Sequence, residues 1–292
     1  MTSENYDNQT VTADTEQPLT ATEAGTGEHE HTLYSETLFH WGKLPVTNSL
    51  INSWLVVLVV VIAAMAIGRR IKTVPGKAQA ALEMIVETFL NLYDGVTNSR
   101  AKSIKFAPII LSFFFFILFN NWLGIFPGVG SIGMMVKEGG HEVFVPYFRG
   151  GTADLNTTLA LAIIGVVLSH IFGVMAVGAW HHFNKFINLQ AFLEIPKKIR
   201  KDPTIILVNP IKAFVGLVEI IGELAKVASL SFRLFGNIFA GEVLLAAMAA
   251  ILAFAVPIPF MFLEIVVGLI QALIFSMLIL IYISINTTAE EH

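Results

Sequence analysis

The stretch IILVNPIKAFVGLVEIIGELAKVASLSFRLFGNIFAGEVLLAAMAAILAFA, residues 205–255, is apolar almost throughout and decides the fold class. A helix of about 50 residues extends roughly 75 Å, more than twice the ~30 Å hydrocarbon thickness of a bilayer. The segment is therefore predicted either to break or to lie steeply tilted, far beyond the usual ~20°. Pro257 and Pro259 follow it, so the next apolar run is predicted to return as its antiparallel partner in a helical hairpin.

Four more apolar runs have the length of a membrane span, at 48–68, 105–126, 156–183 and 258–286. Only 14% of the residues are charged and 55% are hydrophobic, whereas soluble domains carry about 25% charged residues. The sequence therefore predicts an all-α polytopic membrane protein with five membrane-crossing helices. Its membrane domain is expected over 48–288, between a polar tail at 1–47 and a short terminus at 289–292.

The stretch 76–97 has a different pattern from the spans. Its apolar residues share one helical face, while its polar residues lie largely on the other. This pattern predicts one amphipathic helix on the membrane surface. The apolar face holds Leu82, Ile85, Phe89, Leu92 and Val96, and the polar one Gln79, Glu83, Glu87 and Asp94.

The basic residues predict the orientation. Seven Lys and Arg lie between residues 69 and 105 and six between 185 and 212, against three in the outer tail and the connections on the opposite side. By the positive-inside rule the N-terminus is outside and the C-terminus inside the cell. Residues 1–36 match neither a signal peptide nor a transit peptide, so a bacterial inner membrane with a periplasmic N-terminal tail is expected.

Polar residues at membrane depth are the candidate functional groups, because a central Arg or Asp costs about 2.5–3.5 kcal/mol on insertion scales. Arg233 has no acid three or four residues away on its own helix, so its counter-charge is expected elsewhere, on another protein in one interpretation. Glu223 and Lys226 are equally well explained as a structural ion pair. One stripe of the fifth segment holds Glu219, Glu223, Lys226, Arg233 and Asn237; Glu242 points elsewhere, and Glu264, Gln271 and Tyr282 share a face of the sixth.

Three classes of function fit these residues: a proton-conducting subunit without a catalytic site, a secondary transporter that holds an anion at Arg233, and an assembly scaffold. The absence of an internal repeat disfavours a transporter built from inverted halves. There is no cysteine, and no cofactor, resident metal or nucleic-acid partner is expected.

Several motifs resemble subunit a of the rotary, F-type ATP synthases of bacteria. They are SLSFRLFGNIFAGE at 229–242, LIQALIFSMLILIYIS at 269–284, DLNTTLALA at 154–162, FNNWLGIFPG at 119–128 and EHEHTLY at 28–34. The resemblance implies a stator held against a rotating ring of c subunits, with the peripheral-stalk b subunits and the rest of the synthase as partners. It implies that Arg233 faces the ring and separates two offset half-channels.

The resemblance also implies roles for further residues. Asn237, Glu242, Glu264 and Gln271 match the outer half-channel, and Glu219 and Ser229 the inner one, with Glu223 one turn further along the stripe. Many members pair a carboxylate with a histidine where this chain has Glu242 and Glu264, so the path of the proton through this pair stays open. His170 and Tyr282 are secondary candidates, and for His170 a buried, hydrogen-bonded structural role is the main alternative.

Overall fold

The computed structural model describes residues 35–69, 71–73, 75–126, 128, 132–138, 141–187, 205–252 and 256–288. Five of its helices are long and apolar enough to cross a membrane. They are α1 (Asn48–Gly68), α3 (Arg100–Ile125), α4 (Leu155–Val177), α7 (Ile205–Ile251) and α8 (Pro257–Thr287). The predicted all-α, five-span fold is confirmed.

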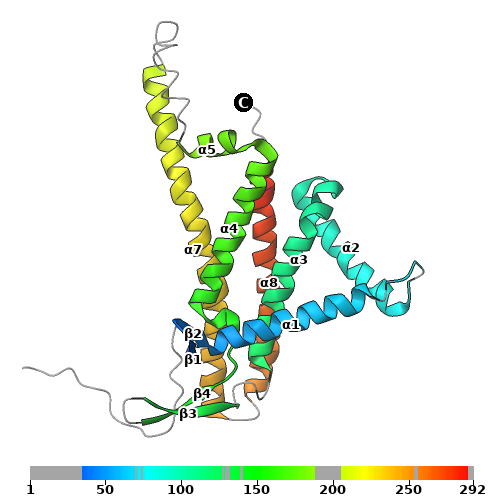
Figure 1. Ribbon diagram of the computed structural model, residues 1–292, viewed down its shortest axis with the longest axis vertical. Coiled ribbons are helices and arrows are strands. Elements are labelled where there is room, and N and C mark those ends of the chain that lie inside the picture. The colour runs from blue at the N-terminus through cyan, green and yellow to red at the C-terminus, as the bar shows by residue number, and fades with distance from the viewer. Residues whose placement is uncertain are drawn as a thin grey trace, which may run out of the picture.

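The long apolar segment does not break. α7 is one helix of 47 residues, so of the two predicted alternatives only the unbroken helix remains. α8 runs back along it, and the two form the predicted antiparallel hairpin (Figure 1). A connection at 252–256 joins them, and Pro257 occupies the start of α8, where its missing N–H costs no helical hydrogen bond.

The fourth span is shorter than predicted. α4 ends at Val177 rather than near residue 183, because Gly178 has a φ of +88° that a right-handed helix excludes. A short helix, α5 (Ala179–Ile187), follows at an angle and crosses toward α7 (Figure 1). This change of direction brings residues of α5 against α4 and α7.

The predicted amphipathic helix is α2 (Lys77–Thr97). It leads into α3 through Asn98, which has a left-handed φ of 51°. Across this corner the Arg100 Nη1 atom lies 2.8 Å from the Asp94 carboxylate, on the exposed surface. Phe89 and Tyr93 point to the other side, where Phe89 contacts Phe114 of α3. In Figure 1, α1 and α2 project away from the other long helices.

Two antiparallel β-hairpins were not predicted. β1 (Thr37–Trp41) pairs with β2 (Leu44–Thr47) inside the predicted polar tail, of which residues 1–34 lie outside the described residues. β3 (Gly133–Glu138) pairs with β4 (His141–Pro146) in the connection between α3 and α4. Both hairpins lie near the same end of the long helices, opposite α5 (Figure 1).

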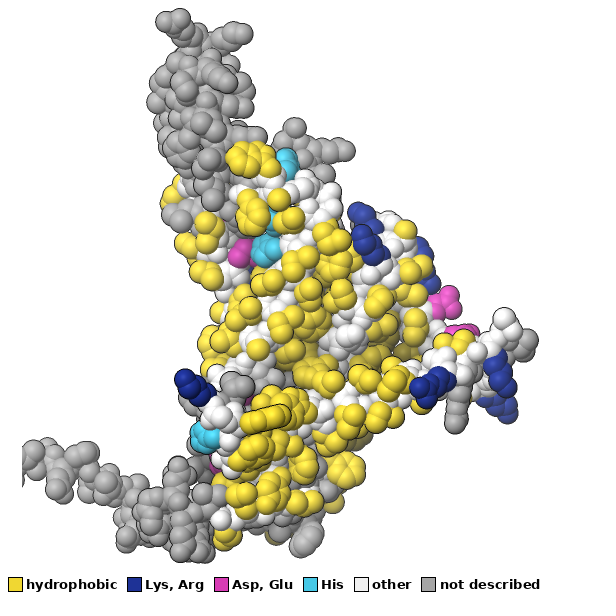
Figure 2. All heavy atoms as spheres, viewed as in Figure 1, with side chains coloured by type: hydrophobic (Ala, Val, Ile, Leu, Met, Phe, Trp, Pro, Cys, Tyr) yellow, Lys and Arg dark blue, Asp and Glu magenta, His cyan; other side chains and the backbone are white. Residues whose placement is uncertain are grey.

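α8 is the central helix of the packed bundle, in contact with α2, α3, α4 and α7. Its buried Phe275, Ile279, Leu280 and Ile283 pack in one cluster with Ile110 and Ile117 of α3 and Leu230 and Leu234 of α7. Much of the remaining apolar surface is exposed, as Figure 2 shows. A soluble protein does not leave such an area in water, whereas a bilayer accommodates it.

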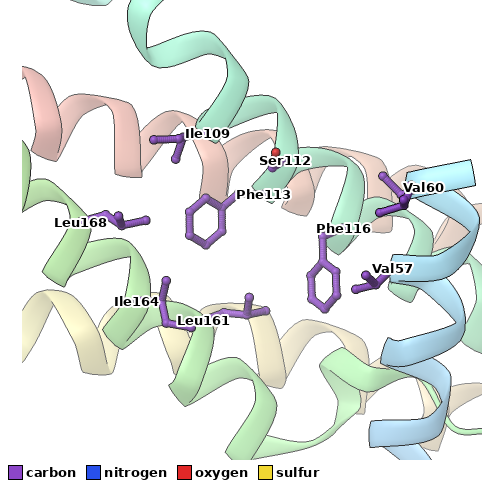
Figure 3. Close-up of a pocket in the computed structure, with 10 residues that line it drawn as sticks. Val57, Val60, Ile109, Ser112, Phe113, Phe116, Leu161, Ile164 and Leu168 are labelled. Carbon is purple, nitrogen blue, oxygen red and sulfur yellow. The ribbon is translucent and has the colours of Figure 1, made fainter. Parts of the chain in front are cut away.

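An apolar hollow of about 450 Å³ lies between α1, α3 and α4 (Figure 3). Val57, Phe113, Phe116, Leu161 and Ile164 are among the side chains that line it, and Ser112 is the only polar one. The Ser112 hydroxyl already donates to the Pro108 carbonyl at 2.7 Å. The hollow therefore presents hydrocarbon alone and takes no part in polar chemistry.

Candidate functional site

Arg233 occupies the exposed side of α7. Its Nη2 atom donates to the Ser229 hydroxyl at 3.5 Å. Within the part of the chain that the structure describes, no carboxylate lies at ion-pair distance from its guanidinium. Leu230 and Leu234 of the same helix are buried in the core. An added Cβ at Gly222 or Gly236 would meet no atom within 4 Å, so open space lies beside α7 on both sides of Arg233 along the helix.

Glu242 forms an ion pair with Arg149. From the sequence, Arg149 was counted only as one of the basic residues of the outer side. Arg149 lies just before the 3-10 turn η2 (Gly151–Ala153). Its Nε and Nη2 atoms both contact one Glu242 carboxylate oxygen, at 3.3 and 3.2 Å. The side chains are 11% and 21% exposed. A pair so sheltered is screened far less than a surface salt bridge.

Glu264 lies beside this pair and is only 6% exposed. Its carboxylate packs directly on Gly241 of α7, so closely that a Cβ at residue 241 would overlap it. Glycine at this position is what lets α7 and the Glu264 side chain approach. Gly241 directly precedes Glu242, so the structure brings the two predicted carboxylates to neighbouring positions.

Asn237 and Gln271 join α7 to α8 between Arg233 and the carboxylates. The Asn237 Nδ2 atom donates to the Gln271 Oε1 atom at 2.8 Å. The Gln271 Nε2 atom is buried and has no hydrogen-bond partner among the described residues. An unsatisfied buried donor costs free energy, and a water molecule is the ordinary way to satisfy one.

A second cluster lies toward the α5 end of the long helices. The Lys226 Nζ atom lies 2.6 Å from one Glu223 carboxylate oxygen, and the His170 Nε2 atom lies 3.3 Å from the other. The Lys226 ammonium also sits 5.1 Å from the centre of the Tyr282 ring, a cation–π distance. The predicted Glu223–Lys226 ion pair is present, and His170 and Tyr282 join it. Glu219 is partly buried one turn before Glu223.

Sequence reasoning missed two members of these clusters. His182 of α5 lies within the predicted fourth span, and its Nε2 atom is 3.0 Å from the His170 Nδ1 atom. Arg149 was counted only as a charge of the outer side. The available signal was the same for both: a titratable residue close to the end of an apolar run. Among the described residues, no group of three or more His, Asp or Glu side chains could hold a metal ion.

Pairing of Arg149 with Glu242 predicts a stability effect. Arg149→Gln leaves a sheltered carboxylate without its counter-charge, and breaking a buried pair from one side is strongly destabilising. We expect the thermal dissociation midpoint of the detergent-solubilised complex to fall by roughly 5–10 °C. Arg100→Gln is the matched control, because its partner Asp94 lies at an exposed corner and such pairs contribute about 0–1 kcal/mol. Equal shifts for the two variants would contradict the assignment.

Five apolar helices, two clusters of titratable side chains and, between these clusters, an arginine with no ion-pair partner among the described residues are typical of a polytopic membrane protein that translocates ions. Residues 50–284 match the family described as the ATP synthase A chain, and the chain belongs to that family. It is therefore a component of the ATP synthase complex and a multi-pass protein of the bacterial inner membrane.

Curated relatives agree over most of their length. The chain is 27% identical to the ATP synthase subunit a of Moorella thermoacetica, over 85% of this chain and 94% of that protein. It is 30% identical to the ATP synthase subunit a of a Geobacter species, over 81% of this chain and 86% of that protein. For the ATP synthase subunit a 1 of Hahella chejuensis the identity is 29%, over 84% and 86%.

Proposed function

We propose that the chain is the proton-conducting stator of the ATP synthase membrane sector, with Arg233 separating two half-channels. The position of Arg233 carries this proposal. It is exposed on α7, ten residues after Glu223 and nine before Glu242. Those separations are about 15 and 14 Å along the helix axis, too long for a proton to jump between the clusters without a carrier.

The outer half-channel consists of Glu242, Glu264, Gln271 and Asn237. The two carboxylates lie together at the β3–β4 end of the helices, and the Asn237–Gln271 hydrogen bond continues toward Arg233. Many members of the family have a carboxylate and a histidine at these two positions. This chain has two carboxylates there, and two interacting acids take up and release protons as a coupled pair. Arg149 holds Glu242 in place.

The inner half-channel consists of Glu219, Glu223 and Ser229. Glu223 lies toward the opposite end of the helices, where α5 packs, and Ser229 contacts Arg233 itself at 3.5 Å. The positive-inside pattern assigns this end to the cytoplasm and the β-hairpins to the periplasm. Protons therefore enter near Glu242 and leave near Glu223 during synthesis.

Arg233 has no ion-pair partner among the described residues, and its counter-charge is a carboxylate on the ring of c subunits. A guanidinium does not lose its proton, so it favours the ionised form of each ring carboxylate that passes and drives loss of the proton on the inner side. It also blocks direct proton flow between the half-channels. Each proton must then travel with the ring, so that ion flow drives rotation. A charge that crosses a membrane potential of 100 mV releases about 2.3 kcal/mol.

We also propose that α7 and α8 lie steeply tilted in the bilayer. An unbroken helix with an apolar portion over Phe214–Ile251 exceeds the ~30 Å hydrocarbon thickness at any small tilt. α1 runs across the long axes of α3, α4, α7 and α8 (Figure 1), so it and they cannot all follow the membrane normal. With this tilt, one helix can line both half-channels and contact the ring and the b subunits of the peripheral stalk.

Glu264→Leu tests the outer half-channel. Because it removes a buried, titratable relay group, we expect the rate of ATP-driven proton pumping into inverted membrane vesicles to fall roughly 10²-fold. Glu83→Leu is the matched control: Glu83 lies exposed on α2, where its carboxylate accepts a hydrogen bond from Gln79. Equal rates for the two variants would remove Glu264 from the path.

A further inference from the structure

Three titratable side chains from three helices form a continuous chain next to the proposed inner half-channel. The Nδ1 atom of His170 on α4 lies 3.0 Å from the Nε2 atom of His182 on α5. The Nε2 atom of the same His170 ring lies 3.3 Å from the Oε2 atom of Glu223 on α7. One imidazole therefore touches a carboxylate with one nitrogen and a second imidazole with the other. This is the connectivity that a proton relay needs.

The two oxygens of the Glu223 carboxylate differ in their hydrogen bonding. Its Oε1 atom accepts a hydrogen bond from Lys226 at 2.6 Å. Its Oε2 atom is buried and accepts no hydrogen bond of good geometry from any described residue. The His170 Nε2 atom faces it at 3.3 Å, so a small rotation of the ring completes the contact. The unsatisfied Oε2 atom is therefore placed to exchange a proton with the His170 Nε2 atom.

His182 is held in place by the shape of the α4–α5 corner. Its side chain is only 3% exposed and packs on Gly173, where an added Cβ would lie 2.7 Å from the imidazole Cε1 atom. The neighbouring His181 is exposed. Two consecutive histidines thus have opposite environments, and only the buried one contacts His170.

We propose that His170 and His182 form a two-imidazole proton relay between Glu223 and the surface at α5. The relay is the inner exit of the path, so this inference rests on the proposed function. It assigns His182 a role in proton transfer and makes His170 the link between α4 and α7. Figure 2 shows histidine and acidic side chains gathered on this part of the visible surface, below α5.

Each transfer moves one proton and leaves the charges balanced. A proton on Glu223 passes from Oε2 to the His170 Nε2 atom, while the proton on the His170 Nδ1 atom passes to the His182 Nε2 atom. The proton on the His182 Nδ1 atom then leaves to a water molecule that enters the α4–α5 corner, since the ring itself is only 3% exposed. Both rings end neutral in the opposite tautomer, and the carboxylate ends ionised. Return of the tautomers by proton exchange resets the relay, since either imidazole nitrogen can carry the proton.

The groups around Glu223, His170 and His182 favour transfer of the proton away from Glu223. Lys226 on α7 favours the ionised form of Glu223 once its proton has left. Tyr282 on α8 contacts Lys226, and Glu219 lies one turn away on α7. The competing explanation is a structural one, in which the two histidines only join α4, α5 and α7. A side chain that keeps the hydrogen bonds but cannot pass a proton through its ring separates the two.

Glutamine is that side chain. In the complete ATP synthase in inverted vesicles, we expect His182→Gln and His170→Gln each to slow ATP-driven proton pumping about 10²-fold while the complex assembles normally. His181→Gln is the matched control on the same helix, and its pumping rate should equal that of the unaltered protein. The solvent deuterium isotope effect on pumping should also change in the first two variants and not in the third.

Normal pumping by both His170→Gln and His182→Gln would overturn the relay. If the same vesicles then still lost pumping in Arg233→Ala, the proposed function would stand and only this inference would fall. Should His182→Gln not assemble, His170→Gln applies the same test from α4. Failure of both to assemble would assign the pair a structural role and would likewise overturn the relay.

Discussion

Replacement of Arg233 by alanine abolishes ATP-driven proton pumping while the complex still assembles. Arg233 hydrogen-bonds with Ser229 alone among the described residues and lies on the exposed side of α7. Its removal therefore breaks no ion pair within this part of the chain and leaves the core around Leu230 and Leu234 unchanged. The loss should appear in transport and not in folding.

The size of the effect follows from the charge. Without a fixed cation, nothing favours ionisation of a ring carboxylate at the inner half-channel, so the ring carries protons past it without releasing them. The barrier to direct flow between the half-channels is lost as well. We expect pumping to fall to the level of vesicles without the complex, measured by quenching of a pH-sensitive dye. Arg100→Ala, at the exposed α2–α3 corner, should pump normally.

Other outcomes would have distinct meanings. Normal pumping by Arg233→Ala would overturn the proposed function. Failure to assemble would favour a scaffold, in which the polar stripe only packs helices. Unchanged pumping with loss of uptake of a small anion would favour a secondary transporter. Immunodetection of the assembled complex in the same vesicles separates the expected loss of pumping from a failure to assemble.

The membrane helices could be predicted because hydropathy and length determine them almost alone. A run such as 48–68 has no alternative to a helix at membrane depth, since every backbone polar group must be satisfied internally. The end of α4 could not be predicted as well, because apolar residues continue past Gly178 and only the positive φ of that glycine ends the helix. The β-hairpins depend on pairing between short segments that have no strong pattern of their own.

The residues of the candidate site could likewise be predicted only in part. The cost of a polar group in lipid singled out Arg233, Glu242 and Glu264, and the structure packs Glu264 on Gly241, next to Glu242. Arg149 and His182 could not be found by that argument, because both lie at the ends of apolar runs where polar residues are ordinary. Their roles come from contacts across 93 and 12 residues of sequence, which periodicity within one helix does not report.

Gly241→Ala should slow proton pumping roughly 10- to 100-fold without preventing assembly. A Cβ at residue 241 would occupy the position of the Glu264 carboxylate. Because that carboxylate is the far end of a flexible side chain, it can move aside and the helices need not separate. The displaced acid then lies out of line with Glu242 and Gln271. A misplacement of about 1 Å at a reacting group can cost 10²-fold in rate.

A compensating variant distinguishes displacement of Glu264 from general damage to the α7–α8 contact. Glu264→Asp shortens the side chain by one methylene, so in the Gly241→Ala background it makes room for the new methyl group. We expect the double variant to pump faster than Gly241→Ala alone. Gly95→Ala is the matched control, since no atom lies within 4 Å of its added Cβ. If the double variant were slower than both single ones, the two changes would damage the site independently, and close packing on Gly241 would not be what positions Glu264.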